Sequence, residues 1–335
     1  WDVVKGFKDK DIERIITFNT YYLNKFSNLD IKLSFGKIKF FRKLAKIIYF
    51  YLILIRLQRF QKVDILYIEK PRIMNKKIIA LFKKKINFIV AYSRDSLLKK
   101  SNKNYDLINF INESNIFYYT KQWQQDDISK IITNTPIKFY PHSAYIKKVI
   151  NKNNKFYIPE KINIENSFIF VGEFESNRAQ ILRSISEEFK VLVFGPGWSK
   201  KIKDKYNFPN NFRFQDTFLN RYKYLLMAQR SLASFCFFRK SVNDLFTDRP
   251  VELALNEVCI ISEYSKYQEK IFRDKKECFY FKNSNELNEL MKIITKDINL
   301  AKSVGKSARE RALKLKLTTK DLTNNILQSY FEQYS

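Results

Sequence analysis

Glycine, proline, cysteine and histidine are all scarce in this sequence. The 335 residues include 6 Gly and 7 Pro, too few for a turn-rich all-β protein. One histidine and three cysteines without a CxxC pair argue against a zinc site and against a disulfide framework. We therefore expect no metal, and a protein that works in a reducing cytosol.

Acidic residues are also few. The 34 Asp and Glu stand against 62 Lys and Arg, a formal net charge of +28. An AT-rich genome would explain the abundance of Lys, Ile, Asn, Phe and Tyr, but it would not deplete the acids. The excess positive charge predicts a polyanionic partner, which could be a nucleotide diphosphate, anionic lipid or nucleic acid.

Apolar runs long enough to cross a bilayer are missing. The longest candidate, Ile47–Leu57, has about half the required length and contains Arg56. A buried helix is the first interpretation, and a helix on a membrane surface beside the basic patch Lys37–Lys46 is the second. No signal peptide is visible, and the sequence begins at Trp1 rather than Met.

What the sequence does have is ample core material in two similar halves. Apolar residues make up 45% of the chain, and its length suits two domains of about 150 residues. Short apolar runs without alternation are typical of parallel strands covered on both faces. In the first half we expect strands at Arg14–Phe18, Ile65–Glu69, Phe88–Tyr92, Ile116–Tyr119 and Ile137–Tyr140, and helices at Phe40–Phe60, Lys76–Lys84, Tyr105–Glu113 and Asp126–Thr133.

The second half repeats this order. The polar stretch Lys147–Asn166 is expected to be a linker between domains. We expect strands at Ser167–Val171, Val191–Phe194, Phe212–Gln215, Ala233–Phe237 and Cys259–Ser262, and helices at Arg178–Glu188, Asn220–Ala228, Pro250–Leu255, Asn285–Lys292, Leu300–Leu315 and Thr318–Tyr334. The prediction is an α/β protein with two Rossmann-like domains, residues 1–146 and 167–317, and a C-terminal helix over 318–335.

Ligands of such sheets bind beyond the carboxyl ends of the strands. Three glycines lie there, Gly172, Gly195 and Gly197, where the backbone could pass close to a ligand or could simply turn.

The segment Asp244–Glu252 is more informative. Pro250 suits the first turn of a helix, which places Glu252 where that helix begins. A carboxylate there could accept two ribose hydroxyls beside a diphosphate, and Asp244 could accept hydroxyls of a second sugar. The alternative is that Asp244 and Asp248 are turn residues and Glu252 is a helix-terminus acid.

Five ordered segments of the second half carry a resemblance to a known family: Phe170–Arg178, Val193–Trp198, Asp244–Glu252, Ile261–Tyr264 and Glu277–Glu286. In the first half, Tyr92–Asp95 and Phe139–Ser143 are weaker matches. From Ser167 to about Tyr334 the chain resembles the donor domain of GT-B glycosyltransferases, in particular the CgeB-like group near glycosyltransferase family 4. The resemblance implies two domains that face each other across a cleft and a C-terminal helix that returns toward the first domain.

The resemblance implies roles for individual residues. The family has two glutamates separated by seven residues. Asp244 and Glu252 match that spacing with Asp in the first place, so Glu252 would hold the ribose and Asp244 the donor sugar. The further candidates for donor binding are Arg178, Arg239, Arg249, Phe214 and Asp216, the last two beside the base. His142 is the second candidate for catalysis. It lies in a turn that resembles one of the family, although this chain has Ser143 where the family has Gly.

The resemblance also implies a reaction. A nucleotide-diphosphate sugar would donate its sugar to a glycan or lipid-linked acceptor, with retention and without metal, in bacterial polysaccharide biosynthesis. The basic patches Lys37–Lys46 and Lys83–Lys85 suggest docking at the inner membrane face. Two alternatives stay open: a basic protein that binds nucleic acid, and a catalytically degenerate scaffold with the same fold.

Overall fold

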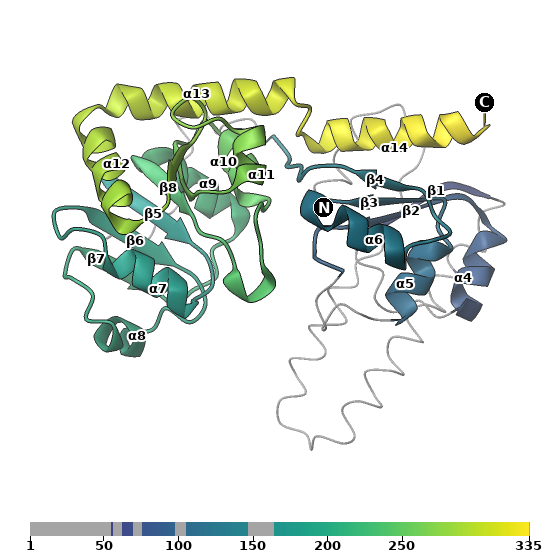
Figure 1. Ribbon diagram of the computed structural model, residues 1–335, viewed down its shortest axis with the longest axis horizontal. Helices are drawn as coiled ribbons and strands as arrows, with labels where there is room; N and C mark the ends of the chain where they lie inside the picture. Colours follow the sequence, from purple (N-terminus) through teal and green to yellow (C-terminus); the bar gives the residue numbers. More distant parts are fainter. Residues whose placement is uncertain (1–54, 56–61, 70–75, 98–104, 147–163, 335) are drawn as a thin grey trace, which may run out of the picture. The chain divides into compact units, whose positions relative to one another are not determined.

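Four parallel strands form the first sheet of the computed structural model (Figure 1). The structure describes residues 55, 62–69, 76–97, 105–146 and 164–334. The strands lie in the order of the sequence and confirm four of the five predicted in this half. They are β1 (Val63–Glu69), β2 (Ile86–Ser93), β3 (Ile116–Tyr119) and β4 (Ile137–Phe139). The predicted strand Arg14–Phe18, the patch Lys37–Lys46 and almost all of Phe40–Phe60 lie outside the described residues.

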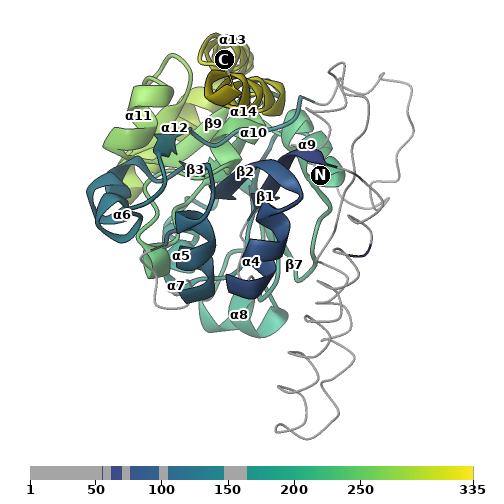
Figure 2. The same cartoon turned by 90° about the vertical axis from the view of Figure 1, so that its right-hand side faces the viewer.

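Three helices cover one face of this sheet: α4 (Lys76–Lys83), α5 (Tyr105–Asn112) and α6 (Gln125–Ile131). Figure 2 shows α4 and α5 side by side. Ile89, Ala91 and Phe117 point from the strands into the core beneath these helices. Their neighbours Phe88 and Tyr118 point to the opposite face, as the two-residue period of a strand requires.

The last helix of the chain, α14 (Thr319–Tyr334), covers that opposite face. The Tyr118 hydroxyl lies 2.9 Å from Ser329 Oγ and donates to the Asn325 carbonyl at 3.1 Å. Phe88 meets Tyr330 edge to face, with ring centroids 5.7 Å apart. The prediction that a C-terminal helix returns to the first domain is therefore confirmed.

Six parallel strands form the second sheet, in the order β10-β9-β8-β5-β6-β7. β5, the first of them in sequence, lies in the interior, between β8 and β6. This is the doubly wound order typical of a Rossmann fold. The strands are β5 (Ser167–Val171), β6 (Lys190–Phe194), β7 (Phe212–Gln215), β8 (Ala233–Cys236), β9 (Ile260–Glu263) and β10 (Phe279–Phe281).

Helices pack on both faces of this sheet. Residues of α7, α12 and α13 join Phe168, Val191 and Phe235 in one core, while α9 and α10 pack on strands from the other face. The helices are α7 (Ser176–Arg183), α8 (Lys200–Lys205), α9 (Arg221–Arg230), α10 (Arg249–Ala254), α11 (Lys266–Ile271), α12 (Ser284–Lys296) and α13 (Ile298–Lys314). A 3-10 turn, η3 (Lys240–Val242), follows β8, and another, η2 (Gln122–Gln124), precedes α6 beside the first sheet.

Two predicted helix ends in this half of the chain were wrong. The helix expected over Asn285–Lys292 continues to Lys296. The helix expected over Arg178–Glu188 ends at Arg183. The side chain of Asn288, from α12, accepts a hydrogen bond from the Ser186 amide at 2.7 Å. A tertiary contact thus takes the amide that a longer helix would have used. Three short elements were not predicted from the sequence: α8, α11 and β10, which are six, six and three residues long.

The described residues form two compact units. One holds those up to Pro141 together with those from Thr323 onward, and the other holds those between His142 and Leu322. Residues 147–163, most of the predicted linker, lie outside the described residues. No helix in the described part of the chain is long and apolar enough to span a membrane.

Candidate functional site

The candidate site lies where the order of the second sheet reverses, between β5 and β8. The chain moves outward from β5 through β6 and β7, then crosses back to β8 on the other side. Helices that follow neighbouring strands then diverge, and loops at the carboxyl ends can hold a ligand. Here these loops are Gly172–Glu175, after β5, and Phe237–Arg239, after β8.

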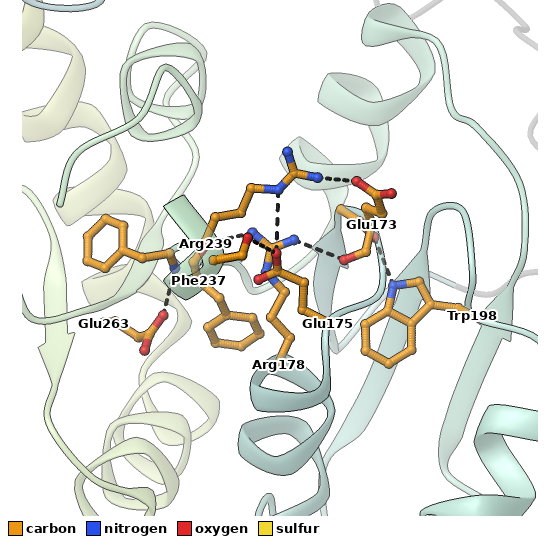
Figure 3. Close-up of polar contacts among 10 residues, drawn as sticks. Glu173, Glu175, Arg178, Trp198, Phe237, Arg239 and Glu263 are labelled. Carbon is orange, nitrogen blue, oxygen red and sulfur yellow. Dashed lines mark hydrogen bonds and ion pairs between the residues drawn. The ribbon is translucent and has the colours of Figure 1, made fainter. Parts of the chain in front are cut away.

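Arg178 joins these two loops from the first turns of α7 (Figure 3). Its guanidinium donates to the Glu173 carbonyl at 2.9 Å and to the Phe237 carbonyl at 3.2 Å. It also pairs with Glu175 at 3.9 Å. Burial lowers the pKa of Arg178 and Glu175 opposes that shift, but an arginine keeps its charge at neutral pH. Arg178 therefore places a buried positive charge under the loops, with two of its hydrogen bonds made to backbone.

Arg239 lies above Arg178 and is more exposed. It pairs with Glu173 and, at 3.7 Å, with Glu175. The Ser241 hydroxyl donates to the same Glu175 carboxylate at 2.9 Å. Two arginines and two carboxylates thus balance one another at the switch point. The charges are close enough that an anionic ligand could exchange places with a carboxylate.

Glu263, at the end of β9, holds the loop after β8 from the other side. Its carboxylate accepts a hydrogen bond from the Phe238 amide at 2.6 Å. Burial raises the pKa of Glu263, and this hydrogen bond opposes the shift. Arg178 and Glu263 together fix the backbone from which the Arg239 side chain extends (Figure 3).

The three glycines predicted at strand ends lie in one pair of packed loops. Trp198 Nε1 donates to the Gly172 carbonyl at 2.8 Å. Gly195 has φ +144°, and a Cβ there would lie 2.0 Å from the same carbonyl oxygen. Gly197 has φ +87°, and its amide donates to Asp216 Oδ1 at 2.8 Å. The close packing of these loops is a sufficient reason for glycine at position 195.

The two residues predicted near the base lie at the end of β7. Phe214 stacks on Trp198, with ring centroids 5.6 Å apart, and one oxygen of Asp216 is used by Gly197. Both residues therefore support the loop after β6.

Glu252 lies in the first turn of α10, as the sequence predicts, and its side chain is buried. One carboxylate oxygen pairs with Arg221, the first residue of α9, and the other lies 3.5 Å from Arg249. Arg249 stacks over the buried ring of Tyr224 at 4.2 Å. Burial lowers the pKa of Arg249, but Tyr224 and Glu252 outweigh it and raise that pKa overall. The carboxylate is therefore held between two guanidinium groups.

The two candidates for catalysis are linked through Phe246. Asp244 follows Asn243, which has a left-handed backbone (φ 50°), and its amide donates to the Arg239 carbonyl at 3.2 Å. Phe246, two residues later, meets the ring of His142 edge to face at 5.6 Å. His142 is itself buried. The structure thus brings the loop of Asp244 to His142 on one side and to Arg239 on the other.

Five residues of this site were not singled out as candidates by the sequence analysis: Glu173, Glu175, Arg221, Tyr224 and Glu263. The two glutamates and Glu263 lie inside segments that carried the resemblance, but only sheet order sets them beside Arg239 and Phe238. Arg221 had one usable signal, a positive charge at the start of a helix, where positive charge is unfavourable. Within the described ranges, no three side chains of His, Cys, Asp or Glu form a group that could hold a metal ion.

Comparisons with known proteins relate the chain to glycosyltransferases in sequence and in fold. Residues 178–328 match the glycosyl transferase-like family. No curated protein matches the chain in sequence. Among solved structures, HepE of Anabaena, in complex with UDP-glucose, is similar at a TM-score of 0.59 and 10% identity, over 85% of this chain and 82% of that chain.

Two further solved structures are similar. An α,α-trehalose-phosphate synthase (UDP-forming) of Burkholderia vietnamiensis has a TM-score of 0.60 and 8% identity, over 90% of this chain and 79% of its own. Sucrose-phosphate synthase of Thermosynechococcus elongatus has a TM-score of 0.52 and 11% identity, over 81% of this chain and 74% of its own. At such identities the likeness is one of fold.

Proposed function

We propose that this chain, a glycosyltransferase of the GT-B fold, moves a sugar from a nucleotide-diphosphate sugar to a glycan or lipid-linked acceptor. The observation that carries the proposal is the pair of arginines at the switch point, since Arg239 and the buried Arg178 both pair with Glu175 (Figure 3). Planar guanidinium groups suit phosphate oxygens, and this is the place in a doubly wound sheet where a nucleotide binds.

The roles of the remaining residues follow from the same placement. Glu252 accepts the ribose hydroxyls, and Asp244, on the loop that starts at Arg239, accepts hydroxyls of the donor sugar. His142 contacts that loop through Phe246 and acts on the acceptor side. Phe214 and Asp216, through the loop that they support, define the base pocket.

The reaction we propose is transfer with retention and without metal. The bond from the anomeric carbon to the diphosphate breaks through an oxocarbenium-like state, and negative charge builds on the leaving phosphate. Arg239 and Arg178 lie where they would stabilise that charge, and the arrangement is in place before the reaction begins. The acceptor hydroxyl then attacks the anomeric carbon on the face from which the diphosphate departs, and its proton passes to the leaving phosphate.

The proposal also covers the group of glycosyltransferases to which the chain belongs and the place of the protein in the cell. The ordered motifs Phe170–Arg178 and Asp244–Glu252 favour a CgeB-like enzyme near family 4. The basic segment Lys83–Lys85 and the charge of +28 favour a peripheral place at an anionic membrane, where a lipid-linked acceptor would be found. Vesicles with anionic lipid should co-sediment the protein better than neutral vesicles, and equal binding would contradict this location.

A thermal-shift panel tests the donor site. UDP, GDP, ADP, CMP and TDP are compared on the wild type, Glu252→Ala and, as a matched control, Glu187→Ala, an exposed acid just before β6. A ligand at about a hundred times its dissociation constant adds roughly 2.7 kcal/mol to stability, which raises the melting temperature by several degrees. We expect one nucleotide to stabilise the wild type and the control, but not Glu252→Ala.

Two outcomes of that thermal-shift panel would contradict the proposed donor site. If none of the nucleotides stabilises the wild type, the donor site is absent and a degenerate scaffold with this fold becomes the better description. If Glu252→Ala responds as the wild type does, the ribose lies elsewhere.

A further inference from the structure

Helix α9 contacts Glu252 and its neighbour Arg249 through two side chains one turn apart. Arg221, its first residue, pairs with one oxygen of the Glu252 carboxylate. Tyr224 lies beneath Arg249 at 4.2 Å, and Arg249 approaches the other oxygen at 3.5 Å. The start of α9 is itself held in place, because the Asn220 side chain accepts from the Lys223 amide at 2.9 Å.

Arg221 does not stabilise its own helix from this position. Positive charge at a helix start opposes the helix dipole, and the first turn of α9 has no acidic residue to offset it. The Arg221 side chain is about one-third exposed, while that of Glu252 is only 10% exposed. A residue that breaks a local rule in this way is expected to serve a site, and its contact here is Glu252.

The two contacts fix the orientation of the carboxylate. An ionised carboxylate offers two acceptor oxygens, and one guanidinium lies at each of them. A carboxylate held in one orientation by both of its oxygens matches a pair of adjacent hydroxyls, as on the 2′ and 3′ carbons of a ribose.

We propose that Arg221 is a positioning residue that sets the selectivity of the donor site for ribonucleotides over 2′-deoxyribonucleotides. It acts through Glu252, by holding the carboxylate so that both hydroxyls are accepted together. This inference rests on the proposed function, since it takes Glu252 to be the ribose acceptor.

The test measures dissociation constants of UDP and 2′-deoxy-UDP, or the corresponding pair for whichever nucleotide of the panel binds. A hydroxyl bonded to a charged group contributes roughly tenfold or more in affinity, so the wild type should prefer UDP by that factor. In Arg221→Ala we expect UDP to bind about five- to tenfold more weakly and 2′-deoxy-UDP less than twofold more weakly. Arg221→Lys, which keeps the charge, should restore part of the preference.

A double variant and a control separate positioning from structure. Glu252→Ala with Arg221→Ala should bind UDP no more weakly than Glu252→Ala alone, because Arg221 acts only through that carboxylate. Arg230→Ala, at the exposed end of the same helix, should change neither dissociation constant. The unliganded melting temperatures of all variants show which of them are folded.

Two results would overturn the inference. If Arg221→Ala weakens both nucleotides equally, Arg221 contacts the diphosphate directly and does not set the selectivity. If the double variant is weaker than Glu252→Ala, Arg221 acts by a second route. A wild type that binds no nucleotide overturns the proposed function and this inference together. A wild type that prefers UDP while Arg221→Ala keeps the full preference overturns this inference alone.

Discussion

At the scale of single residues, the site is a set of opposite charges that already satisfy one another. Arg178 is hydrogen-bonded to backbone carbonyls beneath the loops, so its place is fixed, and as an arginine it keeps its charge at neutral pH. Arg239 is different, because its partners Glu173 and Glu175 are side chains and its own side chain is 41% exposed. A ligand can displace such a partner at small cost, since exposed ion pairs contribute at most about 1 kcal/mol. Arg239 is thus the residue we expect to change partners when a diphosphate binds.

A substitution of Glu173 tests this exchange. Glu173→Gln removes the carboxylate that competes with phosphate for Arg239, and also one negative charge that would repel a diphosphate. We expect UDP, or the nucleotide that the panel identifies, to bind roughly two- to fivefold more tightly, as measured by isothermal titration calorimetry. Glu187→Gln removes the same charge near the amino ends of the strands, away from Arg239, and should not change the binding of the nucleotide. Weaker binding in Glu173→Gln would mean that this glutamate supports the site instead of competing in it.

At the scale of elements, the loops after β5 and β6 are packed against each other and joined by hydrogen bonds. The carbonyl of Gly172 accepts from the Trp198 ring, and the Phe174 amide donates to the Pro196 carbonyl at 2.9 Å. Gly195 lies against that same Gly172 carbonyl and leaves no space for a side chain. Of the two interpretations of these glycines, a close approach to a ligand or a simple turn, the packing of the loops is sufficient to explain Gly195.

Gly195→Ala tests the packing of these loops. The added methyl would lie 2.0 Å from a backbone oxygen, so one loop must move. We expect the free energy of unfolding to fall by about 1–3 kcal/mol, measured by urea denaturation. Ser199→Ala is the control, because this residue precedes α8 and its side chain makes no capping hydrogen bond. It should change stability by less than about 0.5 kcal/mol. An unchanged stability in Gly195→Ala would show that the loops are not tightly packed.

At the scale of the whole molecule, all three cysteines are buried free thiols in the second unit. Burial raises the pKa of Cys236 and of Cys259 to about 12, from the ordinary 9.0, and it raises that of Cys278 as well. Between about pH 9 and pH 12 the unfolded chain therefore loses thiol protons that the folded chain keeps. A raised folded-state pKa means that stability is complete below pH 9 and declines as the pH rises through that window.

Cys259 offers the simplest test of this pH dependence, because burial alone shifts its pKa. Each such thiol should lower the free energy of unfolding by about 1.4 kcal/mol per pH unit in the window. Cys259→Ala should cost stability at pH 7 but lose less than the wild type between pH 9 and pH 11, measured by urea denaturation. Val258→Ala, its buried neighbour, should cost the same at every pH. Parallel pH curves for wild type and Cys259→Ala would show that this thiol ionises freely in the folded protein.

The sequence by itself determined most of the strands and helices in the described residues, and the place of Glu252 in the first turn of α10. Apolar runs, helix periods and the spacing from Asp244 to Glu252 are local properties, and local structure follows from them directly. Short elements without a period of their own were missed: β10 has three residues and exists because it pairs with β9.

Only the tertiary structure decided which charges meet. Glu173 and Arg239 are 66 residues apart in sequence, and Arg221 and Glu252 belong to different helices. They meet because β8 crosses back to lie beside β5, and because α9 and α10 both begin at the carboxyl edge of that sheet. In a chain with 62 basic residues, the position of Arg221 at a helix start is a local signal, but no local pattern shows which carboxylate an arginine of this edge meets. Strand order distinguishes them, since it alone sets which loops are neighbours.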